Sequence, residues 1–167
     1  CDLRIAALLE GQPAPTPVGA RLAAAAAALG RAARSLDADG AHLAVWGLLG
    51  LGPGSTPAGD DFLCGFVLAL LCTAGDDPAR ARFLGGLGAF LDGASPATVE
   101  LSATFLRCAV RALAPGSLAE TARALAAGEA RAAALGLRRS CAAGHSSGAD
   151  LSTGFLYGLT IWAAGER

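Results

Sequence analysis

The stretch GLGPGSTPAGDDFLCGFVLALL, Gly50 to Leu71, decides the expected fold. It begins as a glycine- and proline-rich loop and becomes, after Asp60 and Asp61, an almost wholly apolar helix. Eighty-nine residues later the pattern returns as GHSSGADLSTGFLYGLTIWAA, residues 144–164. Setting Gly59 on Gly148 also aligns Asp61 with Asp150, Gly65 with Gly154, Phe66 with Phe155 and Leu70 with Leu159. Two Gly/Ser/Thr loops that lead into acid-headed apolar helices predict two halves of one polar site.

The two apolar helices are expected at the centre of the fold. Residues 62–71 and 151–164 carry no charge past the first turn, and a helix that is apolar all round is typical of a buried position. Small residues recur one turn apart in both, at Gly65/Ala69 and at Gly154/Gly158. Glycine within a helix costs about 1 kcal/mol relative to alanine, so a close backbone approach is the expected reason for it. We predict that the two helices cross face to face and are related by a pseudo-twofold axis.

The rest of the chain predicts an all-α bundle of about seven helices, a single domain over residues 1–167, because alternating strand patterns are missing. A possible helix tail at 2–10 precedes a Pro-rich connector, 11–17. A turn is expected at 37–40 and a loop at 93–96. The segment Ala41–Leu49 fits either a strand or a helix. Ser117 and Glu120 are predicted to form a capping box at the start of a helix. The expected helices span 18–36, 60–72, 80–91, 98–113, 117–127, 129–142 and 149–164.

Composition excludes several classes of protein. Hydrophobic residues make up 53% and charged residues 16%, with a formal net charge of −1. That balance offers no basic field for nucleic acid or anionic lipid, and it leaves surface for partner subunits to cover. No membrane-spanning or signal segment is expected, and five cysteines without CxxC spacing favour buried thiols (Cys64, Cys72, Cys108) and a cytoplasmic location. Because the chain has no methionine, we expect Cys1 to follow a truncation or a cleavage, with an N-terminal nucleophile as one alternative.

The paired loops predict a site for a small anion. A helix N-terminus presents unpaired N–H groups and a partial positive charge. The simpler interpretation is that Asp61 and Asp150 cap their helices while the glycines turn the chain. The predicted substrate-binding residues are Gly52, Gly54, Ser55, Thr56, Gly59, Asp60, Ser146, Ser147 and Gly148.

Three residues are the catalytic candidates: His145, Asp61 and Asp150. His145 would polarise or protonate the reacting group, since its pKa range suits proton transfer, while the two aspartates would orient the loops. No metal is predicted, but Asp60, Asp61 and Asp150 together would suit Mg²⁺, which remains an alternative. We expect His42 to be structural, and Thr98 and Ser102 to cap a helix rather than to add hydroxyls to the site.

With these residues in place, the chain resembles a bacterial family, the AllH-type subunit of oxamate carbamoyltransferase from anaerobic allantoin breakdown. The resemblance rests on Gly50–Gly65, Thr98–Ala109 and Gly144–Gly154, against the family patterns G-x-G-x-G-L-T-P-S-G-D-D-F-L-x-G and G-H-S-S-G-A-D. Here Ser55 replaces the usual leucine and Ala58 the usual serine, with the spacing intact. Family members are longer at the N-terminus, so the resemblance implies that this chain is the C-terminal part of a longer protein.

The resemblance also implies carbamoyl transfer between oxalurate and carbamoyl phosphate, in an assembly with two further subunit types. The leading hypothesis is therefore a transferase subunit that binds a small anion, such as carbamoyl phosphate or oxamate, at the paired loops. One alternative is an all-helical Mg²⁺-dependent hydrolase with an aspartate cluster, and the other is a structural or regulatory subunit whose loops only lock the two central helices.

Overall fold

The computed structural model describes residues 16–162, and this part of the chain is all helical, which confirms the predicted fold class. It holds eight α-helices and one short 3-10 helix, with no strand, where about seven helices were predicted. In chain order they are α2 (Pro17–Ser35), α3 (Ala38–Leu48), α4 (Ala58–Thr73), α5 (Pro78–Ala94), η1 (Ser95–Ala97), α6 (Glu100–Val110), α7 (Gly116–Ala126), α8 (Ala130–Cys141) and α9 (Ser147–Leu159).

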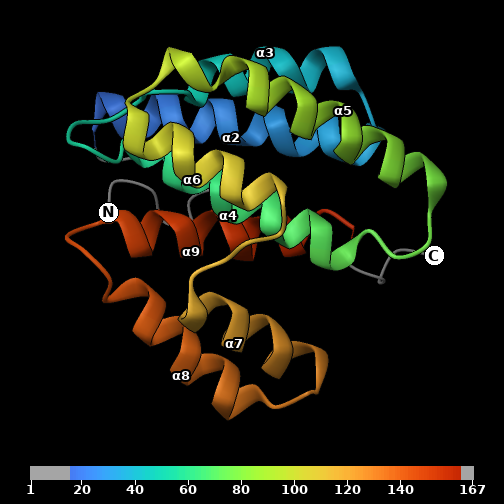
Figure 1. The fold of residues 1–167 in the computed structure, drawn as a ribbon, viewed down its shortest axis with the longest axis vertical. Coiled ribbons are helices and arrows are strands. Elements are labelled where there is room, and N and C mark those ends of the chain that lie inside the picture. Colours follow the sequence, from blue (N-terminus) through green and yellow to red (C-terminus); the bar gives the residue numbers. More distant parts are fainter. Residues whose placement is uncertain (1–15, 163–167) are drawn as a thin grey trace.

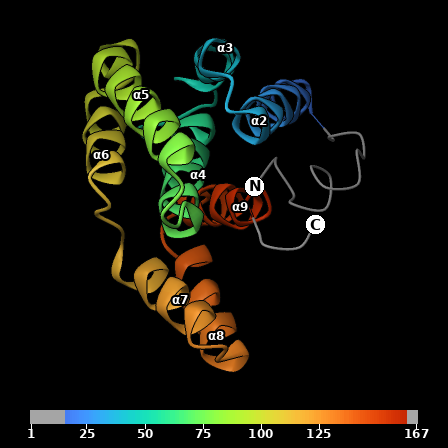
Figure 2. The same ribbon diagram turned by 90° about the vertical axis from the view of Figure 1, so that its right-hand side faces the viewer.

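The helices surround the two that the sequence singled out. Helix α4 lies at the centre with α9 packed along it, α2 and α3 to one side and α5 and α6 to the other (Figure 1 and Figure 2). Helices α7 and α8 form an antiparallel hairpin that projects from one end and joins the body through α9 (Figure 2). No helix in residues 16–162 is long and apolar enough to cross a membrane.

Helix α4 occupies the core as predicted, while α9 does so only in part. Every residue from Gly59 to Leu70 is buried. In α9, however, Leu151, Leu156 and Leu159 are only half-buried, so the expectation of no solvent-facing side is wrong for that helix. The expected continuation of this helix to Ala164 reaches beyond the described residues, and the regular helix ends at Leu159.

The small residues of α4 and α9 have the predicted purpose. A Cβ added at Gly65 would overlap the carbonyl oxygen of Leu151, and one added at Gly154 would overlap that of Phe62. A Cβ at Gly158 would lie 2.6 Å from that of Ala69. In the sequence repeat, Gly65 corresponds to Gly154 and Phe62 corresponds to Leu151. The contact of Gly65 with Leu151 is therefore the repeat equivalent of the contact of Gly154 with Phe62. Such reciprocal contacts are what a twofold relation produces; the pseudo-twofold axis itself stays a prediction.

Local sequence explains how the first two helices start. Thr16 accepts a hydrogen bond from Gly19 N at 3.0 Å, and Pro17 occupies the first helical position, where its missing N–H costs nothing. The Pro-rich connector therefore ends in the first turn of α2, and residues 1–15, with the expected helix tail, lie outside the described range. Asp37 caps α3 by accepting from Gly40 N at 3.0 Å. The turn predicted over 37–40 is corrected, since residues 38–40 are already helical, and the ambiguous Ala41–Leu49 segment is helix up to Leu48.

Three other boundaries differ from the sequence expectation. The predicted capping box is absent, because α7 begins at Gly116 after Pro115 and places Ser117 inside the first turn, where no side chain caps the helix. The loop expected at 93–96 is mostly the end of α5 followed by the 3-10 helix. Helix α6 is shorter than the predicted 98–113: it starts at Glu100 and ends at Val110, before Ala112 takes a left-handed conformation with φ of 58°.

Candidate functional site

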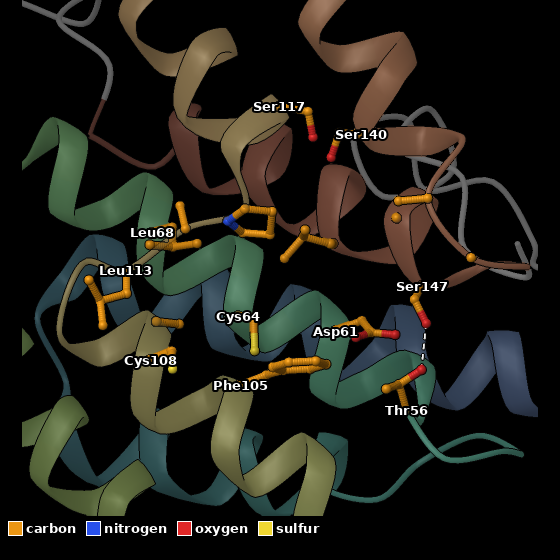
Figure 3. Close-up of a pocket in the computed structure, with 17 residues that line it drawn as sticks. Thr56, Asp61, Cys64, Leu68, Phe105, Cys108, Leu113, Ser117, Ser140 and Ser147 are labelled. Carbon is orange, nitrogen blue, oxygen red and sulfur yellow. Dashed lines mark hydrogen bonds between the residues drawn. The ribbon is translucent and has the colours of Figure 1, made fainter.

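A cavity of about 550 Å³ opens between the central helices and the α7–α8 hairpin. Its walls come from one face each of α4, α6 and α9, and from the segments that lead into α7 and out of α8 (Figure 3). Asp61, Cys64 and Leu68 line it from α4 at helical spacing, and Phe105 and Cys108 line it from α6. The cavity thus joins both halves of the sequence repeat with three elements that the repeat does not include.

One end of the cavity is polar. Thr56, Asp61 and Ser147 lie together there, from the loop before α4, the first turn of α4 and the start of α9 (Figure 3). The hydroxyls of Thr56 and Ser147 are hydrogen-bonded at 2.5 Å, a contact that ties the two predicted loops to each other. Three predicted site residues, Thr56, Asp61 and Ser147, therefore lie together, although Thr56 and Ser147 are 91 residues apart in the sequence.

Asp61 is the most perturbed group at this end. Its side chain is buried, with a relative exposure of 6%, and its Oδ2 atom has no hydrogen-bond partner. Burial, together with the neighbouring charges of Asp150 and Asp60, raises the pKa of Asp61 to about 7, against the lowering effect of hydrogen bonds with Ser147 and Thr56. A carboxyl of this kind exchanges protons near neutral pH, which is a property of acid–base groups.

Asp60, the next residue along the chain, has a different environment. Its Oδ1 accepts from Gly50 N at 2.9 Å, and its Oδ2 accepts from the Thr98 hydroxyl at 2.5 Å. Both oxygens are therefore used to hold the Gly50 loop and the segment before α6. Thr98 does not cap α6, which the sequence favoured, and Ser102 is buried on α6 with an unpartnered hydroxyl.

Several N–H groups at both helix starts are already bonded within the chain. Gly59 N donates to Leu51 O at 2.9 Å, and the N–H groups of Asp60 and Asp61 donate to Pro57 O. At α9, Gly148 N donates to Ala143 O at 3.0 Å, while Ala149 and Asp150 donate to Ser146 O. These are the donors on which the predicted anion site depends, and among the described residues that line the cavity there is no arginine, lysine or histidine. The arrangement favours a neutral ligand group over an anion at this end.

Several predicted site residues lie away from the cavity. Gly52, Gly54, Ser55 and Ser146 do not line it, and His145 is exposed and does not line it either. Gly59 and Gly148 have structural reasons to be glycine, because a Cβ would overlap the carbonyl oxygens of Leu48 and Ser140 respectively. Gly148 also borders the cavity, and Asp150 is buried beside it, close enough for its charge to raise the pKa of Asp61.

The described part of the chain offers no set of side chains that would support the alternative of a Mg²⁺ site. Within residues 16–162, no group of three or more His, Cys, Asp or Glu side chains is placed to hold an ion. The three aspartates influence one another electrostatically, but the oxygens of Asp60 are directed to Gly50 and Thr98. His42, which was expected to be structural, stacks its ring on Phe90 with centroids 4.0 Å apart, although its buried Nε2 atom has no hydrogen-bond partner.

The apolar part of the cavity wall was not predicted as a site, although Cys64, Phe105 and Cys108 lie in the stretches that carry the family resemblance. Cys64, Phe105, Cys108 and Leu113 form an apolar surface next to Asp61, and Ser117 and Ser140 face each other at another corner (Figure 3). Burial, with the charges of Asp61 and Asp60, raises the pKa of the Cys64 thiol, so it stays neutral. Residues of these types are ordinary in helical cores, and only the spacing of Asp61, Cys64 and Leu68 on one face gave a signal.

The fold and site define a helical protein with a cavity beside its central helix pair that is polar at one end and apolar along the rest of its wall. The model of the family described as oxamate carbamoyltransferase subunit AllH matches residues 48–159, well over half of the chain. The chain therefore belongs to the AllH family, and the resemblance found in the sequence is confirmed. The match includes the first repeated stretch, the second as far as residue 159, and every residue that lines the cavity. No curated protein and no solved structure matches the chain.

Proposed function

We propose that this chain is a subunit of an oxamate carbamoyltransferase and that it binds the amide group of the substrate at Asp61. Membership of the AllH family supports the first part, since the family description names that complex. A subunit implies protein partners. The second part depends on one observation: a buried carboxyl with an unpartnered oxygen and a pKa raised to about 7 lies at the polar end of a cavity.

The chemistry of carbamoyl transfer needs such a group. The amide nitrogen of oxamate attacks the carbonyl carbon of carbamoyl phosphate, a C–N bond forms, and the C–O bond to phosphate breaks. The nitrogen must lose a proton in this step, and ionised Asp61 would accept it. In the reverse direction protonated Asp61 would return that proton to the leaving nitrogen. A pKa close to the working pH lets one carboxyl serve both directions.

The hydroxyls of Thr56 and Ser147 would orient the amide in this proposal. Each hydroxyl can both donate and accept, so the pair can donate to the substrate carbonyl while remaining beside Asp61. Asp60 would act as a positioning residue, because its oxygens bond to Gly50 N and to the Thr98 hydroxyl and it does not line the cavity. His145 has no role in this proposed step, because it is exposed and does not line the cavity.

Asp61→Asn in the assembled complex tests the proposal. The variant keeps the shape of the side chain but cannot accept the proton, so the rate of carbamoyl transfer to oxamate should fall by about 10²–10⁴-fold. The limb of the pH–rate profile near pH 7 should disappear with it. Asp76→Asn, at an exposed position between α4 and α5, is the matched control and should keep both rate and profile.

A wild-type rate in the Asp61→Asn complex would rule out the acid–base role. If oxamate and carbamoyl phosphate also bind the variant with unchanged affinity, the chain is better described as a structural subunit. That second function has its own support, because the bond between Thr56 and Ser147 and the two bonds of Asp60 lock the loops within the chain.

A further inference from the structure

The cavity is larger and more apolar than oxamate needs. Its volume of about 550 Å³ falls in the range of pockets that enclose ligands of drug-like size, about 300–1,000 Å³. Oxamate and carbamoyl phosphate are small and polar over their whole surface. With their neutral amide groups at the polar end near Asp61, they would leave the apolar rest of the cavity unfilled.

The remaining walls suit an uncharged hydrocarbon group. Leu68, Phe105, Cys108 and Leu113 provide apolar surface beyond the polar end, and the Cys64 thiol beside them stays neutral. A carboxylate or phosphate placed against these side chains would lose its hydration without gaining a partner, at a cost of several kcal/mol. Burial of a hydrocarbon group there is favourable in proportion to its area.

The polar end fixes which head group such a ligand carries. The Oδ2 atom of Asp61 is buried and without a partner, so it offers a site for a hydrogen-bond donor. One O–H of the adjacent hydroxyl pair is used in the bond between Thr56 and Ser147, and the other can donate to a carbonyl oxygen. A neutral N–H beside a C=O, as in an amide or a urea, matches both features at once.

We propose that the cavity binds an amide or ureido compound with an apolar substituent, its N–H at Asp61 and its substituent along Cys64, Phe105 and Leu113. The inference rests on the proposed function for the position of the amide, and it extends the substrate class beyond oxamate to larger acceptors. Phe105 and Leu113, with exposures of 44% and 60%, lie at the mouth and would select the substituent.

Calorimetric titration of the purified chain with urea, n-butylurea and phenylurea, and separately with oxamate, measures this preference. We expect affinity to rise from urea to n-butylurea by roughly fourfold for each methylene group that becomes buried. Phe105→Ala should lower the preference for phenylurea over urea by roughly tenfold. Leu101→Ala is the matched control, because Leu101 lies on the same helix, is exposed to a similar degree at 46%, and does not line the cavity.

Three outcomes would overturn the inference. One is equal affinity for urea and phenylurea, another is an equal effect of Phe105→Ala and Leu101→Ala, and the third is phenylurea binding that Asp61→Asn leaves unchanged. A complex that transfers carbamoyl groups to oxamate through Asp61 but shows any of these keeps its proposed function. The converse result is also possible: Asp61→Asn abolishes phenylurea binding but leaves the carbamoyl transfer rate of the complex unchanged. That result supports the proposed ligand class and rules out the proposed function.

Discussion

The neighbouring aspartates at the start of α4, Asp60 and Asp61, have different surroundings and different hydrogen bonds. Successive residues on a helix point about 100° apart, so Asp60 faces the Gly50 loop and Thr98 while Asp61 faces the cavity. Both carboxylate oxygens of Asp60 accept hydrogen bonds, from Gly50 N and from the Thr98 hydroxyl. Asp61 keeps one oxygen without a partner and has its pKa raised from 3.8 to about 7. Of these two adjacent acids, Asp60 is therefore a positioning residue and Asp61 a candidate functional residue.

The raised pKa of Asp61 predicts how stability depends on pH. An acid whose pKa is higher in the folded state binds more protons when folded, so the free energy of unfolding falls as pH rises between about 4 and 7. Asp61→Asn should match the wild type near pH 4 and exceed it at pH 8, by up to about 4 kcal/mol. Urea denaturation of both proteins at the two pH values measures this difference, with Asp76→Asn as the control.

The difference between variant and wild type is the informative quantity, because other acids also titrate in this window. If Asp61→Asn changes the free energy of unfolding by the same amount at pH 4 and pH 8, the folded-state pKa of Asp61 is not raised. Such a result would also remove the observation on which its acid–base role depends.

At the scale of elements, glycines let the backbones of α4 and α9 approach each other closely, while Phe62 and Phe66 of α4 also contact Tyr157 of α9. Gly65 meets the Leu151 carbonyl, and Gly154 meets that of Phe62. This close approach brings Ser147, at the start of α9, next to Thr56 and Asp61. The polar end of the cavity thus depends on glycines that lie about one to two turns further along each helix.

Gly65→Ala should therefore destabilise the protein strongly. The added methyl group would overlap the Leu151 carbonyl, and separating the helices would cost about 3 kcal/mol. Gly85→Ala is the matched control: it also lies within a helix, has no atom within 4 Å of the added Cβ, and should stabilise by about 1 kcal/mol. Thermal unfolding of both variants tests the prediction, and a Gly65→Ala protein as stable as wild type would contradict the packing described for α4 and α9.

At the scale of the whole molecule, the hairpin of α7 and α8 is the least integrated part of the described chain. Helix α7 makes its main contacts with α8, and α8 joins the body through α9. The core, by contrast, is formed around α4, whose residues from Gly59 to Leu70 are all buried. The hairpin nevertheless supplies one side of the cavity, through Ser117 and Ser140.

This difference predicts unequal protection of backbone amides. Elements with few buried contacts open at lower free energy than the core, so amides of α7 should exchange hydrogen faster than those of α4. Hydrogen exchange followed by mass spectrometry measures both in one experiment. A ligand that fills the cavity should slow exchange in α7 more than in α2, which lies outside the cavity. Equal protection of α7 and α4 without ligand would show that the hairpin is part of the core.

The sequence by itself determined the helical class, the two special helices and the glycines at their contact. These follow from local pattern: apolar residues on every face require burial, and glycines at helical spacing permit close packing. It also identified the family, through loops whose spacing is intact. Helix boundaries at Asp37 and Ser117 were less certain, because several residues in each stretch can cap a helix.

The tertiary structure alone decided which of these residues share a cavity. Helix–helix packing turned Asp61 inward and Asp60 toward Thr98, and bonded the N–H groups on which the anion hypothesis depended. It also brought α6 and the hairpin against α4, so that Phe105, Leu113 and Ser140 became cavity walls. No local pattern encodes these contacts, because they depend on which helix faces meet across long separations in the chain.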